Sequence, residues 1–249
     1  MINSRLLEQT MQPWLINLES CESTNTWALE HLSELHHGDT IFTHNQTAGR
    51  GQFDRSWISS SGVLTASFVL ELSISQLPGF SLIAGLAVIH AIETLLPDQQ
   101  GALRLKWTND VFAAGRKLSG ILCESRIRAD QAQVVVGIGL NCETVPEFVQ
   151  NAISLQDISA DVPDREKLLA QLRTNLMNFC DRAFSTLLPE IRSRDLLLDR
   201  SIVFESGGKQ CTGKGAGIDD EGQLLIRFGD EVKRYRSGRV LSIDDLPNL

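Results

Sequence analysis

The residues of this chain that could do chemistry lie in four short segments rich in glycine, lysine and arginine. The first is the motif GRG at 49–51, inside the polar stretch 46–62. Glycines on both sides of Arg50 let backbone N–H groups approach a ligand closely. The guanidinium can bind a carboxylate or a phosphate through two parallel hydrogen bonds. With Arg55 and Trp57 nearby, the stretch is typical of a functional loop; the alternative is a solvated loop whose glycines serve only turns.

Two further segments supply lysines and a carboxylate. In KWTND (106–110), Asn109 and Asp110 end a strand at a turn, and the Asp110 carboxylate could hold Mg²⁺ through a nucleotide's phosphates. In RKLSGIL (116–122), Lys117 opens an apolar strand and would be a strong point charge for a carboxylate or a phosphate. The plain alternatives are a polar strand end and a solvated lysine in a hairpin turn.

The fourth segment is GIGLN (137–141), where the glycines permit close backbone approach and Asn141 can both donate and accept a hydrogen bond. The segment lacks the third glycine of a dinucleotide-binding fingerprint, and no helix clearly follows it.

Composition excludes several classes of protein. The 249 residues carry a formal net charge of −8, and no basic block is present, so we expect no DNA binding. No apolar run reaches the about 18–20 residues of a membrane span, and we expect neither a signal peptide nor a membrane partner. The five cysteines are scattered without a CxxC pair, which predicts free thiols in the cytoplasm and no bound zinc. They are Cys21, Cys123, Cys142, Cys180 and Cys211.

The elements that must position these segments can be predicted from hydrophobic periodicity. We expect helices at 23–36, 79–96 and 164–188, the last ended by Pro189, and the second buried on all sides. Strands are expected near 40–44, at 63–72, at 103–107 with one solvated face, as a hairpin of 111–112 with 118–125, and at 134–141.

The pattern changes after about residue 197, where short strand-like runs alternate with Gly-rich turns. We therefore predict two domains, at 1–197 and 198–249. Because helices and strands do not alternate regularly in the first, we predict an α+β fold with a mixed, mostly antiparallel sheet. The second should be a small β-barrel.

Taken together and in this order, the segments resemble one family, the biotin protein ligases. The resemblance covers residues 20–145 in detail and continues into the C-terminal barrel. The residues that carry it are Ser23-Thr24-Asn25, QTAGRG at 46–51 with Arg55 and Trp57, Lys106-Trp107 with Asn109-Asp110, RKLSGIL at 116–122, GIGLN at 137–141 and GIDDEGQLLI at 217–226.

The resemblance implies a fold like that of class II aminoacyl-tRNA synthetases, followed by an SH3-like barrel. It implies an enzyme that joins biotin to Mg-ATP, releases pyrophosphate, and passes biotin from biotinyl-5′-AMP to a lysine of a biotin carboxyl carrier domain. Too few residues precede Ser23 for the DNA-binding domain of bifunctional members, so a monofunctional ligase is expected. Members include monomers and homodimers, and both arrangements stay open here.

The same resemblance assigns roles to residues. Lys117 and Arg50 would be catalytic, contacting the carboxylate and the α-phosphate. The biotin-binding set would be Ser23, Thr24, Asn25, Gln46, Arg50, Gly51, Gln52 and Lys117. The ATP-binding set would be Arg55, Trp57, Lys106, Asn109, Asp110 and Asn141, with Asp110 also holding Mg²⁺. The loop 49–57 is expected to be mobile without ligands and ordered with biotin and ATP.

Three positions depart from the family pattern. Gln52 stands where an arginine is frequent, Thr108 replaces a proline, and Arg239 follows Gly238 where an acidic residue is frequent. Two other functions stay open: a lipoate or octanoate ligase or transferase, and a non-catalytic biotin-binding protein. Some transferases of the lipoate and octanoate group use a cysteine nucleophile, but we expect Cys123 to be a buried, inert thiol.

Overall fold

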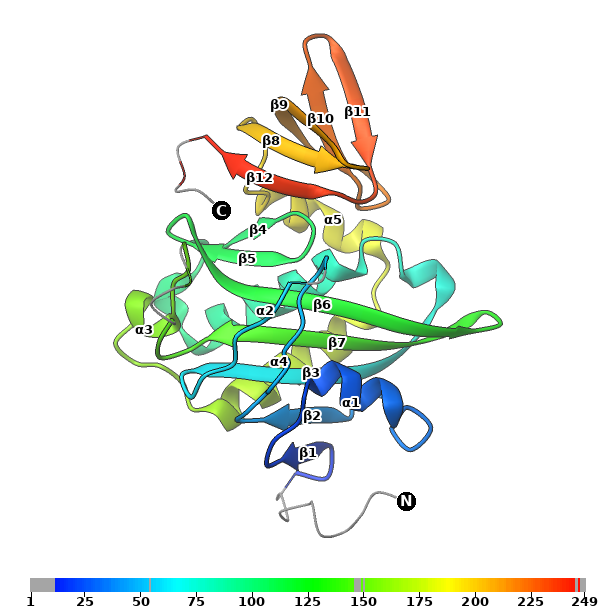
Figure 1. Cartoon of the computed structure of the whole chain (residues 1–249), viewed down its shortest axis with the longest axis vertical. Coiled ribbons are helices and arrows are strands. Elements are labelled where there is room, and N and C mark those ends of the chain that lie inside the picture. Colours follow the sequence, from blue (N-terminus) through cyan, green and yellow to red (C-terminus); the bar gives the residue numbers. More distant parts are fainter. Residues whose placement is uncertain (1–11, 54, 146–148, 150, 245, 247–249) are drawn as a thin grey trace.

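The computed structural model of the chain describes residues 12–53, 55–145, 149, 151–244 and 246, which form two sheets and the helices around them (Figure 1). In the larger sheet β1 and β2 are parallel, and every other neighbouring pair is antiparallel, which confirms the predicted mixed sheet. Its strands lie in the order β1 (Leu15–Leu18), β2 (Thr40–Thr43), β3 (Val63–Ser73), β7 (Gln131–Asn141), β6 (Arg116–Arg128), β5 (Asp110–Ala113) and β4 (Arg104–Lys106).

Helices cover both faces of this sheet, because side chains alternate between the faces along each strand. Phe68 and Val136 face the main core with α2 and α4, whereas Val69 and Val135 pack on the opposite face with α1. The helices are α1 (Thr24–Glu30), α2 (Phe80–Leu95), α3 (Leu155–Ile158), α4 (Arg165–Cys180) and α5 (Phe184–Ser193), with short 3-10 helices at Ile74–Gln76 and Pro97–Gln99.

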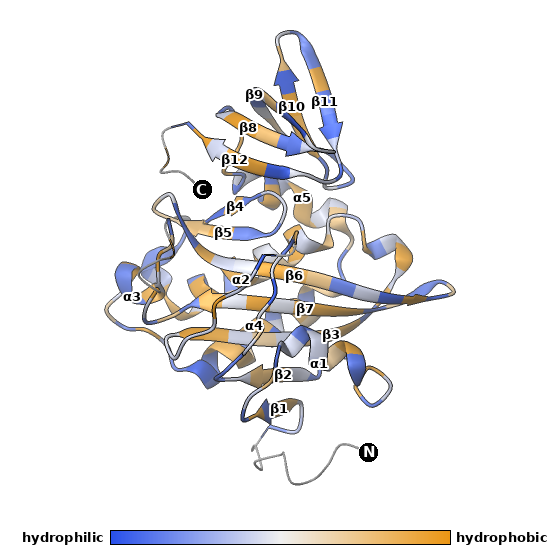
Figure 2. Cartoon of the chain, viewed as in Figure 1, coloured by the Kyte–Doolittle hydropathy of each residue, from blue (hydrophilic) through white to orange (hydrophobic). Residues whose placement is uncertain are grey.

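The hydropathy pattern follows these layers (Figure 2). Apolar residues dominate β3, β7 and the buried helix α2, as predicted, and polar residues dominate β11 (Glu231–Tyr235) and the outer end of β6. Among the described residues, no helix has the length and apolar character needed to cross a membrane.

The predicted boundaries of two helices were wrong. The helix expected at 23–36 ends at Glu30, and the chain beyond it folds into turns that still bury Leu32 and Leu35. The single helix expected at 164–188 is two helices, because the chain turns at 181–183 and directs the apolar residues of α5 onto α2. Pro189 therefore lies inside α5 instead of ending a helix. Strand β1 was not predicted.

The C-terminal residues form a five-stranded antiparallel sheet, as expected of a small barrel-like unit. Its order is β11 (Glu231–Tyr235), β10 (Leu224–Phe228), β9 (Lys209–Ile218), β8 (Ser201–Ser206) and β12 (Arg239–Ile243). The predicted boundary at 197/198 falls in the connection between α5 and β8. Trp107 joins the two sheets, since its indole N–H donates to the Gly222 carbonyl at 2.9 Å and its ring lies 6.2 Å from that of Phe204.

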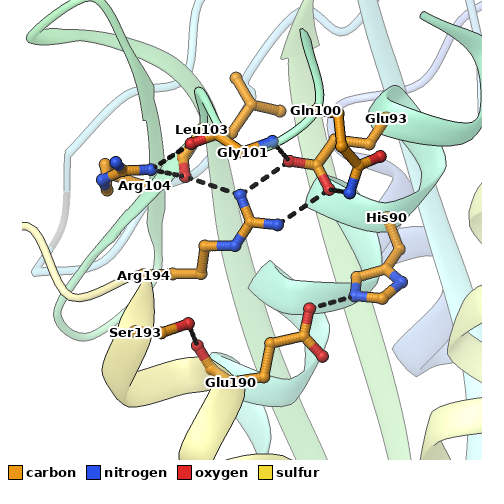
Figure 3. A network of polar contacts seen from close by, with 9 residues as sticks. All are labelled: His90, Glu93, Gln100, Gly101, Leu103, Arg104, Glu190, Ser193 and Arg194. Atoms are coloured by element: carbon orange, nitrogen blue, oxygen red, sulfur yellow. Dashed lines mark hydrogen bonds and ion pairs between the residues drawn. The ribbon is translucent and has the colours of Figure 1, made fainter. Parts of the chain in front are cut away.

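A buried ion pair fixes the connection between the two units (Figure 3). Arg194, just after α5, donates from both terminal nitrogens to the Glu93 carboxylate of α2, at 2.7 and 2.9 Å. The Arg194 carbonyl also accepts the backbone N–H of Leu105 on β4. Since β4 ends in Lys106, the same connection that holds the C-terminal unit also supports a predicted site residue.

Candidate active site

Strand register brings three of the four sequence segments, KWTND, RKLSGIL and GIGLN, onto one face of the large sheet. Residues directly opposite each other on paired strands point to the same face. The pairs Lys106–Asp110, Asp110–Gly120 and Gly120–Gly139 therefore form a continuous row across β4, β5, β6 and β7, which continues to Thr65 on β3. Residues as far apart in sequence as Thr65 and Gly139 thus meet because the strands pair in this order and register.

A cavity of about 230 Å³ lies over this row. Every site residue predicted from the sequence lines it, together with residues of the C-terminal sheet. Those predicted residues are Ser23, Thr24, Asn25, Gln46, Arg50, Gly51, Gln52, Arg55, Trp57, Lys106, Asn109, Asp110, Lys117 and Asn141.

At one end of the cavity a buried carboxylate lies between two lysines. Lys117 Nζ is 2.6 Å from Asp110 Oδ1, and Lys106 Nζ is 3.6 Å from Asp110 Oδ2. Burial alone would raise the pKa of Asp110, but Lys117, Lys106 and Arg55 together hold it below its ordinary value, so the carboxylate is charged. Burial lowers the pKa of Lys106, and Asp110 opposes that shift.

The burial of Lys106 shows that one prediction about its strand was wrong. The strand at 103–107 was predicted to have one solvated face, yet Lys106 is 8% exposed on the face opposite Leu105. It can be buried because its ammonium group lies beside the Asp110 carboxylate, which offsets part of the cost of desolvation. The predicted solvated face is therefore covered at Lys106, whereas Arg104 on the same face stays partly exposed.

At the other end, a chain of hydrogen bonds joins α1 to the sheet. Gln46 Oε1 accepts from the Thr24 backbone N–H at 2.8 Å and from its hydroxyl at 3.1 Å. Ser67 Oγ lies 2.7 Å from Thr24 Oγ1 and 2.6 Å from Asn25 Oδ1. These polar groups are fixed in a largely buried wall and could recognise a neutral ring that offers both donors and acceptors.

The chain of hydrogen bonds ends at Glu124 on β6. Its Oε2 accepts from Asn25 Nδ2 at 2.9 Å and from Arg50 Nη2 at 2.7 Å. Arg50 is thereby held across the cavity by an ion pair whose partners are both partly exposed.

The loop that carries Arg50 is folded as a small hairpin. Arg50 and Ser56 form an antiparallel bridge, Gly51 donates its N–H to the Arg55 carbonyl, and Trp57 donates its N–H to the Gly49 carbonyl. Thr108 Oγ1 lies 3.3 Å from Gln52 Oε1, so two of the positions that depart from the family pattern contact each other.

Trp57 lies flat against the sheet where two glycines face each other. A Cβ atom on Gly139 would overlap the Trp57 indole, and one on Gly120 would come within 3.0 Å of the same ring. The indole N–H is buried and has no hydrogen-bond partner among the described residues. Lys117 Nζ lies 5.6 Å from the ring centre. The indole thus forms an aromatic wall beside the lysine.

Two predicted residues mainly support the backbone. Asn109 Nδ2 donates to the Ile121 carbonyl at 2.7 Å, and Asn141 Nδ2 donates to the Ile153 carbonyl at 3.1 Å. Since Asn141 also lies 3.4 Å from the Lys117 carbonyl, these amides hold the strand from which Lys117 projects.

Sequence reasoning missed Ser67 and Glu124 as members of the site. Ser67 is a fully buried polar residue in the apolar strand β3, and that anomaly could have indicated a site. Glu124 follows Gly120 and Leu122 at two-residue spacing, so it shares their face of β6. The third missed residue, Arg239, comes from the C-terminal sheet, whose placement the sequence could not provide.

Cys123 lies on the opposite face of β6 and packs against the main core. Burial raises the pKa of its thiol to about 12, so the thiol stays protonated near neutral pH. This position and protonation state oppose a role as a nucleophile. All five cysteines are free.

The donor set does not fit a resident metal ion. The described residues contain no group of three or more His, Cys, Asp and Glu side chains placed to hold one. Asp110, the predicted Mg²⁺ ligand, already lies between two ammonium groups. A divalent cation would meet repulsion there unless it arrived with the negative charge of a phosphate chain.

Known proteins resemble this chain over most of its length. A family model described as the biotin/lipoate A/B protein ligase family matches residues 18–141. The bifunctional ligase/repressor BirA of Salmonella typhimurium is 33% identical over 231 residues, covering 88% of this chain and 71% of the relative. The biotin–[acetyl-CoA-carboxylase] ligase of Mycobacterium tuberculosis is 32% identical, covering 83% of this chain and 79% of the relative.

Solved structures of biotin protein ligases are also similar to this chain. The biotin protein ligase of Aquifex aeolicus, in complex with biotin and ATP, matches with a TM-score of 0.75 and 30% identity, covering 91% of this chain and 97% of that one. A biotin protein ligase from Leishmania major, in complex with biotinyl-5-AMP, has a TM-score of 0.66 at 20% identity, and this second likeness shows the fold.

Proposed function

The chain belongs to the biotin protein ligase family, and we propose that it activates biotin with ATP and then transfers the biotinyl group to a protein lysine. The observation that carries this proposal is the pair of lysines around Asp110 in the cavity, with Arg50 facing it from the loop. Adenylation brings a carboxylate and a phosphate chain together, and fixed cations are the groups that such a reaction requires.

In the first step, a biotin carboxylate oxygen would attack the α-phosphorus of ATP. The new bond forms between that oxygen and phosphorus, the bond from phosphorus to the bridging oxygen breaks, and pyrophosphate leaves with its electron pair. Lys117 would contact both the carboxylate and the α-phosphate. Asp110 holds its ammonium in place through an ion pair of 2.6 Å. Arg50 would leave Glu124 for the reacting groups as the loop closes.

The hydrogen-bonded wall of Thr24, Asn25, Gln46 and Ser67 would bind the ureido ring of biotin. This ring is neutral and offers two N–H donors and a carbonyl acceptor, which suits the amide and hydroxyl groups of that wall. Ser23, Gly51 and Gln52, the remaining predicted biotin-side residues, line the same cavity.

The Trp57 indole would form the nucleotide side of the cavity, where an adenine ring can stack on it. Lys106 and Arg55 would meet the phosphates. Asn109 and Asn141 would act through the backbone that they hold, rather than by touching the nucleotide. Mg²⁺ would enter as part of the Mg-ATP substrate, bound chiefly to phosphate oxygens. The pairing of Asp110 with two lysines opposes a direct role for it as a metal ligand.

In the second step, the acceptor lysine amine would attack the acyl carbon of biotinyl-5′-AMP. An amide bond forms, the bond from the acyl carbon to the phosphate oxygen breaks, and AMP leaves while the amine loses a proton. No protein nucleophile takes part, which agrees with the buried Cys123 thiol. We propose a biotin carboxyl carrier domain as the acceptor, a cytoplasmic location, and no binding to DNA. Dimer formation stays open.

The test is biotinylation of a recombinant carrier domain in the presence of Mg-ATP and biotin, followed by intact-mass analysis. The expected result is one added biotinyl group on one lysine. In the Lys117→Ala variant, formation of biotinyl-5′-AMP should fall by a factor on the order of 10²–10³, as is typical when a cation that stabilises developing charge is removed. A wild-type protein that binds biotin but makes no adenylate would instead support the non-catalytic alternative.

A further inference from the structure

We propose that Arg239, from the C-terminal sheet, binds the terminal phosphates of ATP and the departing pyrophosphate together with Arg55; this inference rests on the proposed ligase function. The cavity wall is completed by Gly238, Arg239 and Val240, which lie at the start of β12. In Figure 1, β12 lies directly above β4 and β5, the strands that carry Lys106 and Asp110.

The local backbone explains why Arg239 faces the cavity. Gly238 has a φ of 150°, and a Cβ there would collide with the Phe204 ring and come within 2.6 Å of the Glu205 carbonyl oxygen. Only glycine fits this close approach. The Val240 side chain is buried against the C-terminal sheet and Arg239 is exposed, so alternation along β12 places the Arg239 side chain on the opposite face.

The C-terminal sheet is also firmly attached at this point. The hydrogen bond from Trp107 to Gly222 and the packing of Trp107 near Phe204 join it to the turn that precedes Asp110. Arg194 and Glu93 fix the connecting segment from behind. Arg239 is therefore held beside the site by packed contacts, although it belongs to another sheet.

Arg239 and Arg55 are two cations held close together. The positive charge of Arg239 helps to lower the pKa of Arg55, after the larger effect of burial, and Asp110 opposes the shift. Among the described residues, neither arginine forms an ion pair with a carboxylate, even though Glu205 lies opposite Arg239 on β8. Two unpaired arginines beside one cavity repel each other, and an anion bound between them would remove that cost.

The chemistry of the cavity identifies the anion. Lys117 and Asp110 mark the place where the carboxylate and the α-phosphate would react, and the remaining phosphates of ATP carry most of its negative charge. Both arginines are exposed and line the same cavity, and Arg55 belongs to the loop hairpin. A diphosphate there can accept two parallel hydrogen bonds from each guanidinium. Arg239 also replaces an acidic residue that is frequent in the family, so this contribution is a feature of the present chain.

The test compares Arg239→Gln with a matched control, Arg236→Gln, an exposed arginine in the turn before β12 that does not line the cavity. Pyrophosphate release is measured with Mg-ATP and biotin varied separately, and inhibition by added pyrophosphate is measured in parallel. Arg239→Gln should raise KM for ATP about 10-fold and weaken pyrophosphate inhibition to a similar degree, since a lost charge-assisted contact costs about one decade of affinity. KM for biotin should not change, and neither should any constant of Arg236→Gln.

Transfer from preformed biotinyl-5′-AMP to the carrier domain should be unaffected by Arg239→Gln. Unchanged ATP and pyrophosphate constants would overturn the proposal, and so would a defect confined to transfer, which would assign Arg239 to the acceptor protein. If the wild-type protein released no pyrophosphate with biotin, the ligase function itself would fail. Calorimetric binding of ATP and of pyrophosphate to wild type and variant would still decide the role of Arg239.

Discussion

Glu124 holds Arg50 in place from the opposite side of the cavity, with Oε2 of the carboxylate 2.7 Å from Nη2 of the guanidinium. The same oxygen accepts a hydrogen bond from Asn25, so one carboxylate connects the loop arginine to the wall proposed to bind biotin. The substrate's carboxylate and phosphate would compete with Glu124 for Arg50, which couples the position of the loop to the arrival of ligand.

The Glu124→Gln variant should loosen the loop without disturbing that wall, because a glutamine oxygen can still accept from Asn25. An ion pair with partners as exposed as these contributes at most about 1 kcal/mol. Trypsin cleavage within 49–57, measured without ligands, should therefore accelerate up to about 5-fold, and biotin with ATP should restore protection. The control is Glu71→Gln, an exposed acid on β3. Equal cleavage of wild type and Glu124→Gln would contradict this role.

Gly137 and Gly139 occupy adjacent positions on the same face of β7 but meet different partners. A Cβ on Gly137 would collide with the Asn25 side chain, and a Cβ on Gly139 would collide with the Trp57 indole. Gly137→Ala should therefore raise KM for biotin, and Gly139→Ala should raise KM for ATP, each by about 10-fold or more, because filling a packed contact displaces its partner. Each variant serves as the control for the other. If both variants raised KM for biotin and KM for ATP to the same degree, the two ends of the cavity would not bind the two substrates separately.

Thr108 and Gln52 replace a proline and an arginine of the family pattern, and the contact between them suggests that each compensates for the other. Thr108→Val retains the shape of the side chain and removes the hydroxyl that lies 3.3 Å from Gln52 Oε1. A single partly exposed hydrogen bond contributes about 1 kcal/mol, so release of biotinyl-5′-AMP should accelerate by about 5-fold. The measurement is the dissociation rate of the preformed adenylate, with Thr108→Ser as the control that retains the hydroxyl. Equal dissociation rates of the adenylate from the valine and serine variants would show that this contact does not retain the adenylate.

Much of the site could be predicted from sequence because its residues lie in short motifs of unusual composition. The residues that were missed depend on long-range geometry. Strand register places Ser67 and Glu124 where they hydrogen-bond to residues that line the cavity, and Arg239 reaches the cavity through the docking of the C-terminal sheet. The first two left local signals, a polar residue in the apolar strand β3 and the two-residue spacing of Glu124 from Leu122, whereas Arg239 left none. The burial of Lys106 has the same cause, since its partner Asp110 lies on the neighbouring strand.

The helices and strands divide in the same way, into those with a clear local hydrophobic pattern and those that depend on tertiary contacts. The strongly apolar helix α2 and the long strands β3 and β7 were predicted well, because burial on one or both faces leaves a clear hydrophobic pattern. The break between α4 and α5 was missed because the apolar spacing continues through it, and only the docking of α5 on α2 reveals the change of direction.

Asp195 provides a test of the stability of the connection between the two sheets. Burial raises the pKa of its carboxyl to about 6, and its Oδ2 has no hydrogen-bond partner among the described residues. Because this folded-state pKa lies above the unfolded value of 3.8, the native state binds more protons than the unfolded state between about pH 4 and pH 6. The contribution of this group to stability is therefore fully present below about pH 4 and is lost as the pH rises to about 6.

Asp195→Asn should remove that pH-dependent cost, since asparagine stays neutral and can still accept the Leu197 N–H through its oxygen. Relative to wild type, the free energy of unfolding of the variant should increase between pH 4 and pH 6, by on the order of 2–3 kcal/mol, and remain constant above pH 6. Urea unfolding at a series of pH values measures this difference. A difference that does not vary with pH would show that Asp195 does not titrate in this range.

Pyrophosphate release with Mg-ATP and one of three acids, biotin, lipoate or octanoate, tests the proposed ligase function most directly. The cavity places polar groups suited to the biotin ring at one end and the lysine pair around Asp110 at the other, so release should occur with biotin and not with the other two. Release with lipoate or octanoate in the absence of any release with biotin would show that the chain is not a biotin ligase, and a lack of release with all three would show that it does not adenylate these acids.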